Sequence, residues 1–100
     1  MSIIKHYNKI TSATAVKIID ISTKTKALNS MTLTNVHSAD VTAQVYLENA
    51  ATTKYYIIKD VVIPVGATLK LEQNELDYDS GIFNLYVKVG GTTHLDVIVR

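Results

Sequence analysis

Apolar and polar residues alternate along much of this chain, the pattern of a β-strand with one buried and one wet face. The clearest example is the segment VTAQVYLE at 41–48, where every odd-numbered position is apolar. The segment IFNLYVKV at 82–89 repeats the pattern, again with its odd-numbered positions on one apolar face. No useful length shows the i, i+3, i+4, i+7 spacing of a helix. The pattern therefore predicts strands at both segments.

Less regular alternation predicts strands in the rest of the chain. They are expected at residues 16–21, 27–35, 54–59, 67–71 and 94–100, and residues 61–64 continue extended after the strand at 54–59. Turn signals recur every eight to twelve residues, and Gly90-Gly91 is typical of a hairpin turn. We therefore predict an all-β fold: a single antiparallel β-sandwich, jelly-roll or Ig-like, with seven to eight strands. Residues 13–100 form this domain, and residues 1–12 form an N-terminal arm that can end in a short strand.

Two segments carry additional expectations about burial. Residues 16–21 alternate in two ways, because either Val16 and Ile18 or Ile19 and Ile21 could face inward. Residues 54–59 are apolar on both faces, which indicates a strand covered on both sides or facing a partner. Pro64 follows closely and limits central pairing there, because proline has no N–H to donate.

Composition supports the β class and narrows the function. Thr, Val and Ile are abundant, and six Tyr accompany no Trp and one Pro. Without cysteine the chain has neither a disulfide framework nor a thiolate metal site. Its net charge of +1 comes from 10 basic and 9 acidic residues without a basic run, so we expect no nucleic-acid partner. We expect no membrane span either, because no apolar run approaches ~18 residues.

Candidate catalytic and metal-binding patterns are weak. His6, His37 and His94 have no chelating spacing along the sequence, so we predict no metal and no cofactor. The acidic segment 72–81 resembles a calcium loop only superficially, and a turn in which Leu76 and Tyr78 pack on the sandwich is the better account. Without a G-x-S-x-G motif or a phosphate-binding glycine loop, we predict that the chain is not an enzyme.

The remaining candidates are surface residues that could contact a partner. Alternation places Tyr46, Tyr55 (or Tyr56) and Tyr86 on outer strand faces, where tyrosine serves interfaces. Cross-strand packing of these rings on a wet face is the equal alternative.

The arm is the second candidate contact. Its apolar residues are Ile3, Ile4 and Tyr7, which are too apolar for a free tail. The arm could add a strand to its own sheet or to that of a neighbour.

Several stretches together carry a family resemblance. They are MTLTNV at 31–36, VTAQVYL at 41–47, the run 55–71 with its IPVGATL turn, LYVKV at 85–89 and LDVIV at 95–99. From about residue 14 onward the chain resembles small virion structural proteins of tailed bacteriophages.

The resemblance implies a β-sandwich that docks on other virion proteins in many copies, as a capsid decoration (cement) protein or as a neck or tail component. It also implies a homo-oligomer located in the virion after synthesis in the bacterial host cytoplasm, and it carries no catalytic residues. The alternative is a carbohydrate- or host-surface-binding module of a tail or fibre assembly, with exposed tyrosines as stacking platforms.

Overall fold

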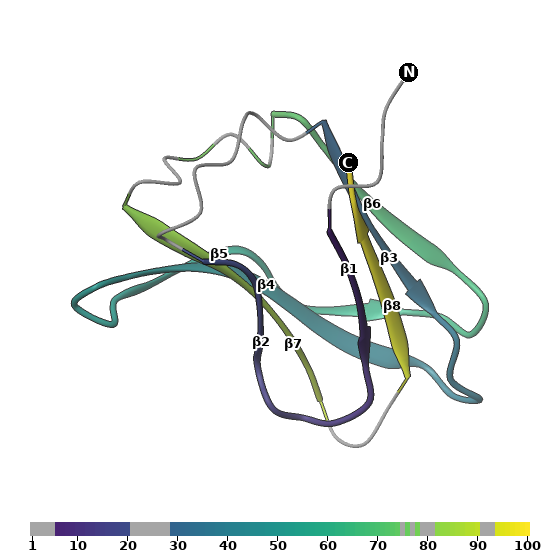
Figure 1. Ribbon diagram of the computed structural model, residues 1–100. Coiled ribbons are helices and arrows are strands. Elements are labelled where there is room, and N and C mark those ends of the chain that lie inside the picture. Colours follow the sequence, from purple (N-terminus) through teal and green to yellow (C-terminus); the bar gives the residue numbers. More distant parts are fainter. Residues whose placement is uncertain (1–5, 21–28, 75, 77, 79–81, 91–93) are drawn as a thin grey trace.

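Eight β-strands form two four-stranded antiparallel sheets that pack face to face (Figure 1). The computed structural model describes residues 6–20, 29–74, 76, 78, 82–90 and 94–100. The strands are β1 (His6–Ile10), β2 (Val16–Ile19), β3 (Ser30–Asn35), β4 (Val41–Asn49), β5 (Lys54–Ile63), β6 (Thr68–Glu72), β7 (Phe83–Val89) and β8 (Leu95–Val99). The predicted all-β sandwich is confirmed. No helix in the described part of the chain is long and apolar enough to cross a membrane.

The first sheet has the strand order β1-β8-β3-β6, and the second has the order β2-β7-β4-β5. The chain crosses to the other sheet after every strand except β4, which forms a hairpin with β5. The prediction of a hairpin at Gly90-Gly91 is therefore wrong, because β7 and β8 belong to different sheets. The connection after Gly90 joins a strand of the second sheet to a strand of the first. Glycine alone does not distinguish a turn within a sheet from one between sheets.

The core lies between the two sheets and is built from the alternation seen in the sequence. Val41, Ala43 and Val45 of β4 are at most 1% exposed, as are their neighbours Val87 and Val89 on β7. The first sheet contributes Met31, Leu33, Leu95, Val97 and Val99, all at most 1% exposed. Full burial of one such side chain stabilises the fold by about 1.5–3 kcal/mol.

β-bulges explain the two segments whose burial pattern was ambiguous. In β2 the register with β7 shifts between Lys17 and Ile19, and Ile18 and Ile19 are both buried. In β5 the register with β4 shifts twice, so β5 contains two more residues than β4 over the same paired length. Ile57 and Ile58 consequently both pack on the core, because a bulge sets two residues opposite one.

Residues 6–10 of the predicted arm form β1 and pair with β8 of their own chain, from His6 opposite Val99 to Ile10 opposite Leu95. Ile10 is 1% exposed and belongs to the core. This part of the arm thus adds a strand to its own sheet. Ile3 and Ile4 lie outside the described residues.

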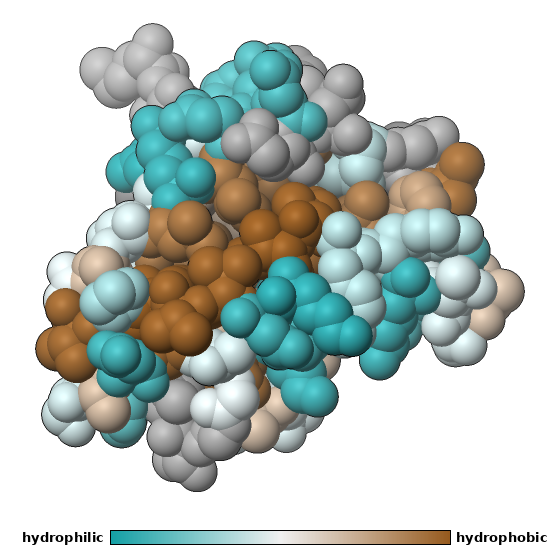
Figure 2. All heavy atoms as spheres, turned by 180° about the vertical axis from the view of Figure 1, so that it is seen from behind, coloured by the Kyte–Doolittle hydropathy of each residue, from teal (hydrophilic) through white to brown (hydrophobic). Residues whose placement is uncertain are grey.

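The sandwich is closed along one side and open along the other. β1 and β2 contact each other on the closed side, whereas β5 and β6 are the edge strands on the open side. Figure 2 shows a band of apolar side chains on the face seen from behind, between two polar areas. Leu69 of β6 and Ile57 and Ile58 of β5 pack against the core but are only partly buried.

The acidic connection before β7 behaves as predicted where it is described. Leu76 is 2% exposed, and Tyr78 packs against the core cluster. Asp77, Asp79 and Gly81, which resemble calcium-loop residues, lie outside the described residues.

Candidate interaction surface

A row of four side chains crosses the outer face of the second sheet at one register position. Lys17 of β2 pairs with Tyr86 of β7, Tyr86 pairs with Tyr46 of β4, and Tyr46 pairs with Tyr56 of β5. We call Tyr46, Tyr56 and Tyr86 the tyrosine row. Strand register alone sets this alignment, because residues opposite each other on neighbouring strands project from the same face.

Contacts within the tyrosine row are aromatic. The rings of Tyr46 and Tyr86 stack with centroids 5.2 Å apart and planes 6° apart, while Tyr46 and Tyr56 are 5.4 Å apart and tilted by 50°. Offset and tilted aromatic pairs of this kind contribute about 0.5–1.5 kcal/mol beyond the area they bury. The row is thus a packed unit that stiffens the outer face.

For Tyr46 the structure shows the alternative of cross-strand ring packing rather than a free surface ring. Its side chain projects outward as alternation requires, but Tyr56 and Tyr86 cover it and leave it 3% exposed. This burial, with a smaller contribution from the Glu48 carboxylate, raises the pKa of the Tyr46 hydroxyl. Tyr56 is 41% exposed and Tyr86 is half-buried, so the accessible part of the row lies at its two ends.

Three lysines lie over the tyrosine row, one to each ring. The Nζ atoms of Lys17, Lys54 and Lys59 are 5.9, 5.2 and 4.9 Å from the ring centroids of Tyr86, Tyr46 and Tyr56 respectively. Lys17 also binds the Asp20 carboxylate at 2.9 Å, and this hydrogen bond raises the pKa of its ammonium group. The outer face is therefore an aromatic surface with cationic side chains above it.

Four large apolar side chains that are exposed lie on or next to β5. Tyr55 is 54% exposed and makes an edge contact with Phe83, and Val62 and Val65 are each 55% exposed. Tyr56 joins this group to the tyrosine row. We call Tyr55, Tyr56, Val62 and Val65 the β5 edge patch.

Strand register decides the sequence alternative between Tyr55 and Tyr56. Tyr56 lies opposite Tyr46 on the outer face, whereas Tyr55 lies opposite Leu47, which packs on the core, and so projects from the other face at the edge of the sheet.

The edge strands differ in how they are protected from pairing with another chain. β6 is short and carries an ion pair between Lys70 and Glu72 at 3.6 Å. β5 has 10 residues and an apolar edge, but it contains two bulges and Asp60 with a φ of 54°. Bulges interrupt the regular row of hydrogen-bonding groups that strand addition requires. The β5 edge patch therefore offers side chains to a partner more readily than backbone.

The remaining candidate from the arm stands apart from these surfaces. Tyr7 of β1 is 76% exposed, and β1 lies in the other sheet, on the closed side. Tyr7 is therefore not part of one continuous surface with the tyrosine row or the β5 edge patch.

At one end of the sandwich the fold also joins two histidines that lie far apart in the sequence. The Nδ1 atoms of His37 and His94 are 3.3 Å apart, and their rings stack with centroids 5.4 Å apart. Local spacing could not reveal this pair, because the two residues meet only through the pairing of β3 with β8. No group of three or more His, Cys, Asp or Glu that could hold a metal ion occurs among the described residues.

No protein-family model matches the chain, and no curated protein matches it. Among solved structures, the Anabaena sensory rhodopsin transducer is similar with a TM-score of 0.47 and 11% sequence identity. The match covers 100% of this chain and 97% of that chain.

Proposed function

We propose that this chain is a structural protein of a bacteriophage virion that docks in many copies on other virion proteins, as a capsid decoration, neck or tail component. The β5 edge patch carries the proposal. It places Tyr55, Val62 and Val65, each more than half exposed, along the uncovered side of the sandwich. Large apolar side chains exposed along one edge strand give a protein partner a surface to bury.

Two further features support docking by side chains on a rigid platform. The patch continues into the tyrosine row through Tyr56, and aromatic side chains are enriched in the centres of interfaces. The neighbouring strand β4 is fully packed on the core, so little conformational entropy is lost on binding. The virion setting itself rests on the sequence resemblance, which runs from about residue 14 onward.

The experiment measures incorporation into particles produced from the genome that encodes the chain. Wild-type chain is expected to co-purify with particles in many copies. V62E and Y55E each place a charge in the patch, and we expect each to lower occupancy at least about tenfold, the effect of losing one interface hot spot. T14E changes an exposed residue in the connection between β1 and β2 and is the matched control.

Two results would contradict different parts of the proposal. Absence of the chain from purified particles would refute the virion role. Full occupancy by V62E and Y55E would retain the virion role but exclude the β5 edge patch. The contribution of the arm is tested by deleting residues 2–5 only, because a longer deletion removes β1 and exposes the core around Ile10.

The tyrosine row favours a second candidate, binding of carbohydrate on a virion or host surface. The 41% exposed ring of Tyr56, with Lys59 above it at 4.9 Å, could stack on a sugar ring. A glycan array probed with the wild-type chain and with Y56A tests it. Hits that disappear in Y56A would support this candidate, and an array without hits would reject it.

A further inference from the structure

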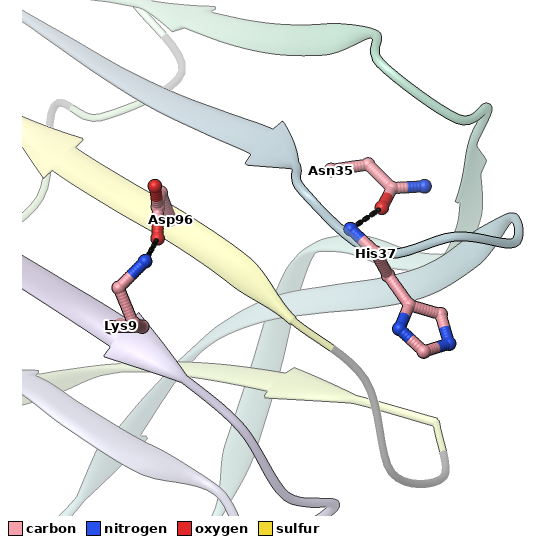
Figure 3. Close-up of polar contacts among 4 residues, drawn as sticks. All are labelled: Lys9, Asn35, His37 and Asp96. Carbon is pink, nitrogen blue, oxygen red and sulfur yellow. Dashed lines mark hydrogen bonds and ion pairs between the residues drawn. The ribbon is translucent and has the colours of Figure 1, made fainter.

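The contact between His37 and His94 is held in place by the backbone on both sides. The Asn35 side chain accepts a hydrogen bond from the His37 backbone N–H at 2.8 Å (Figure 3). The Val36 N–H donates to the carbonyl oxygen of His94 at 3.1 Å. The two histidines are therefore anchored before any ligand arrives.

Asn35 is itself fixed within the fold. It is 1% exposed, and its Nδ2 donates to the carbonyl oxygens of Ala39 at 2.9 Å and Ile63 at 2.8 Å. Ile63 belongs to β5, so one side chain ties the first sheet to the second and fixes the start of the 36–40 connection. Because Asn35 fixes the backbone at His37, the two histidine side chains need little further ordering to bind an ion.

The separation of the two Nδ1 atoms matches that of two ligands on one metal ion. Zinc–imidazole bonds of 2.0–2.1 Å at a tetrahedral angle put the two nitrogen atoms about 3.3–3.4 Å apart. The observed separation is 3.3 Å. Imidazole nitrogen is a preferred ligand of Zn²⁺, Ni²⁺ and Cu²⁺. His94 is exposed and His37 is half-buried, so an ion can reach them from solvent.

We propose that His37 and His94 chelate one divalent transition-metal ion through their Nδ1 atoms. Two protein ligands leave the other coordination positions to water or to an external ligand. The same contact is also compatible with one N–H···N hydrogen bond between neutral rings. The two accounts differ in whether added metal binds at this pair, which an experiment can decide.

The test titrates Zn²⁺ into the full chain without a histidine tag and follows the heat of binding. One ion per chain is expected. H37A and H94A should each lower the zinc affinity at least about tenfold. Loss of a residue that merely supports a metal ligand already has an effect of this size. The matched control is H6A, because His6 lies in β1, away from the pair. The zinc affinity of H6A should equal that of the wild type.

Electron paramagnetic resonance with Cu²⁺ gives a readout that folding defects do not mimic. Two imidazole nitrogens should couple to the copper in the wild type, and one should remain in H37A or H94A. Circular dichroism checks that each variant is folded. If H37A or H94A does not fold, H37Q or H94Q takes its place. Equal zinc affinity in the wild type and the H37Q/H94Q double variant would overturn the proposal, as would loss of binding in H6A alone.

Discussion

Tyr46 and Tyr86 lie at the same register position on β4 and β7, and their rings are parallel to within 6°. This relationship turns an outward-facing tyrosine into a buried one, because Tyr56 covers the other side of the Tyr46 ring. The second sheet thus has apolar packing on both faces at this position. Its stability should depend on a side chain that lies outside the core between the sheets.

Replacing Tyr46 by alanine is expected to lower the free energy of unfolding by about 2–4 kcal/mol, because a nearly fully buried ring and its aromatic contacts are lost. Urea denaturation followed by circular dichroism measures the change. Y7A is the matched control, because the Tyr7 ring is 76% exposed and lies in the other sheet, so its loss should cost about 0.5 kcal/mol or less. Equal losses in the two variants would contradict this role for Tyr46.

Asn35 should be among the most sensitive polar residues of the chain. N35A removes hydrogen bonds to the His37 N–H and to the carbonyl oxygens of Ala39 and Ile63, all at 2.8–2.9 Å. We expect a loss of about 2–4 kcal/mol in the free energy of unfolding, because buried partners are left unsatisfied. N49A removes two hydrogen bonds in an exposed turn and should cost about 1 kcal/mol. A loss in N35A no larger than that in N49A would show that Asn35 does not join the sheets energetically.

The buried hydroxyl of Tyr78 should make the fold less stable in alkaline solution. Burial raises the pKa of its hydroxyl to about 12, above the ordinary value near 10. A folded-state pKa that is raised means that stability is fully present below pH 10 and falls as the pH rises toward 12. The loss should reach up to about 2 kcal/mol. Urea midpoints measured from pH 8 to pH 11.5 follow it.

The variant Y78F tests whether this alkaline loss comes from Tyr78. The buried hydroxyl has no hydrogen-bond partner among the described residues, so its removal should leave stability at pH 7 unchanged or slightly increased. Stability of Y78F should fall less steeply above pH 10, the remainder coming from groups such as Tyr46. An unchanged alkaline slope would contradict the assignment.

The hairpin between β4 and β5 contains a position that should be improved by glycine. Thr52 has a φ of 62°, a conformation that costs a β-branched residue about 1–2 kcal/mol. T52G should raise the free energy of unfolding by about 0.5–1 kcal/mol, because part of this gain is offset by the flexibility of glycine in the unfolded chain. T53G, at a position without positive φ, should instead be destabilising. A thermal melt of both variants decides the matter.

Alternation along the sequence was sufficient to predict the strands and most of their buried faces. The predicted strand at 41–48 corresponds to Val41–Asn49, and that at 82–89 corresponds to Phe83–Val89. The two bulges of β5 were not predictable, because a bulge is set by pairing with another strand. The extended continuation expected from 54–59 into 61–64 is one strand in the structure, and its proline neighbour fits an edge position.

The candidate surface was predicted only in part, for a related reason. Strand periodicity gives the direction in which Tyr46 points but not what covers it, since Tyr56 and Tyr86 come from other strands. The His37–His94 contact joins residues 57 positions apart and appears in no local motif. Pairing between distant segments, rather than residue type, decides both cases.

The position of β8 has a consequence for how the chain acquires its fold. β8 comes last in sequence but sits between β1 and β3, so neither strand has this neighbour until residues 95–99 are available. During synthesis the first sheet therefore cannot be completed until this segment has left the ribosome exit tunnel. Folds dominated by contacts between distant segments also fold slowly, typically in milliseconds to seconds. Until residues 95–99 are available, Met31 and Leu33 lack the Val99 and Val97 neighbours beside which they are buried.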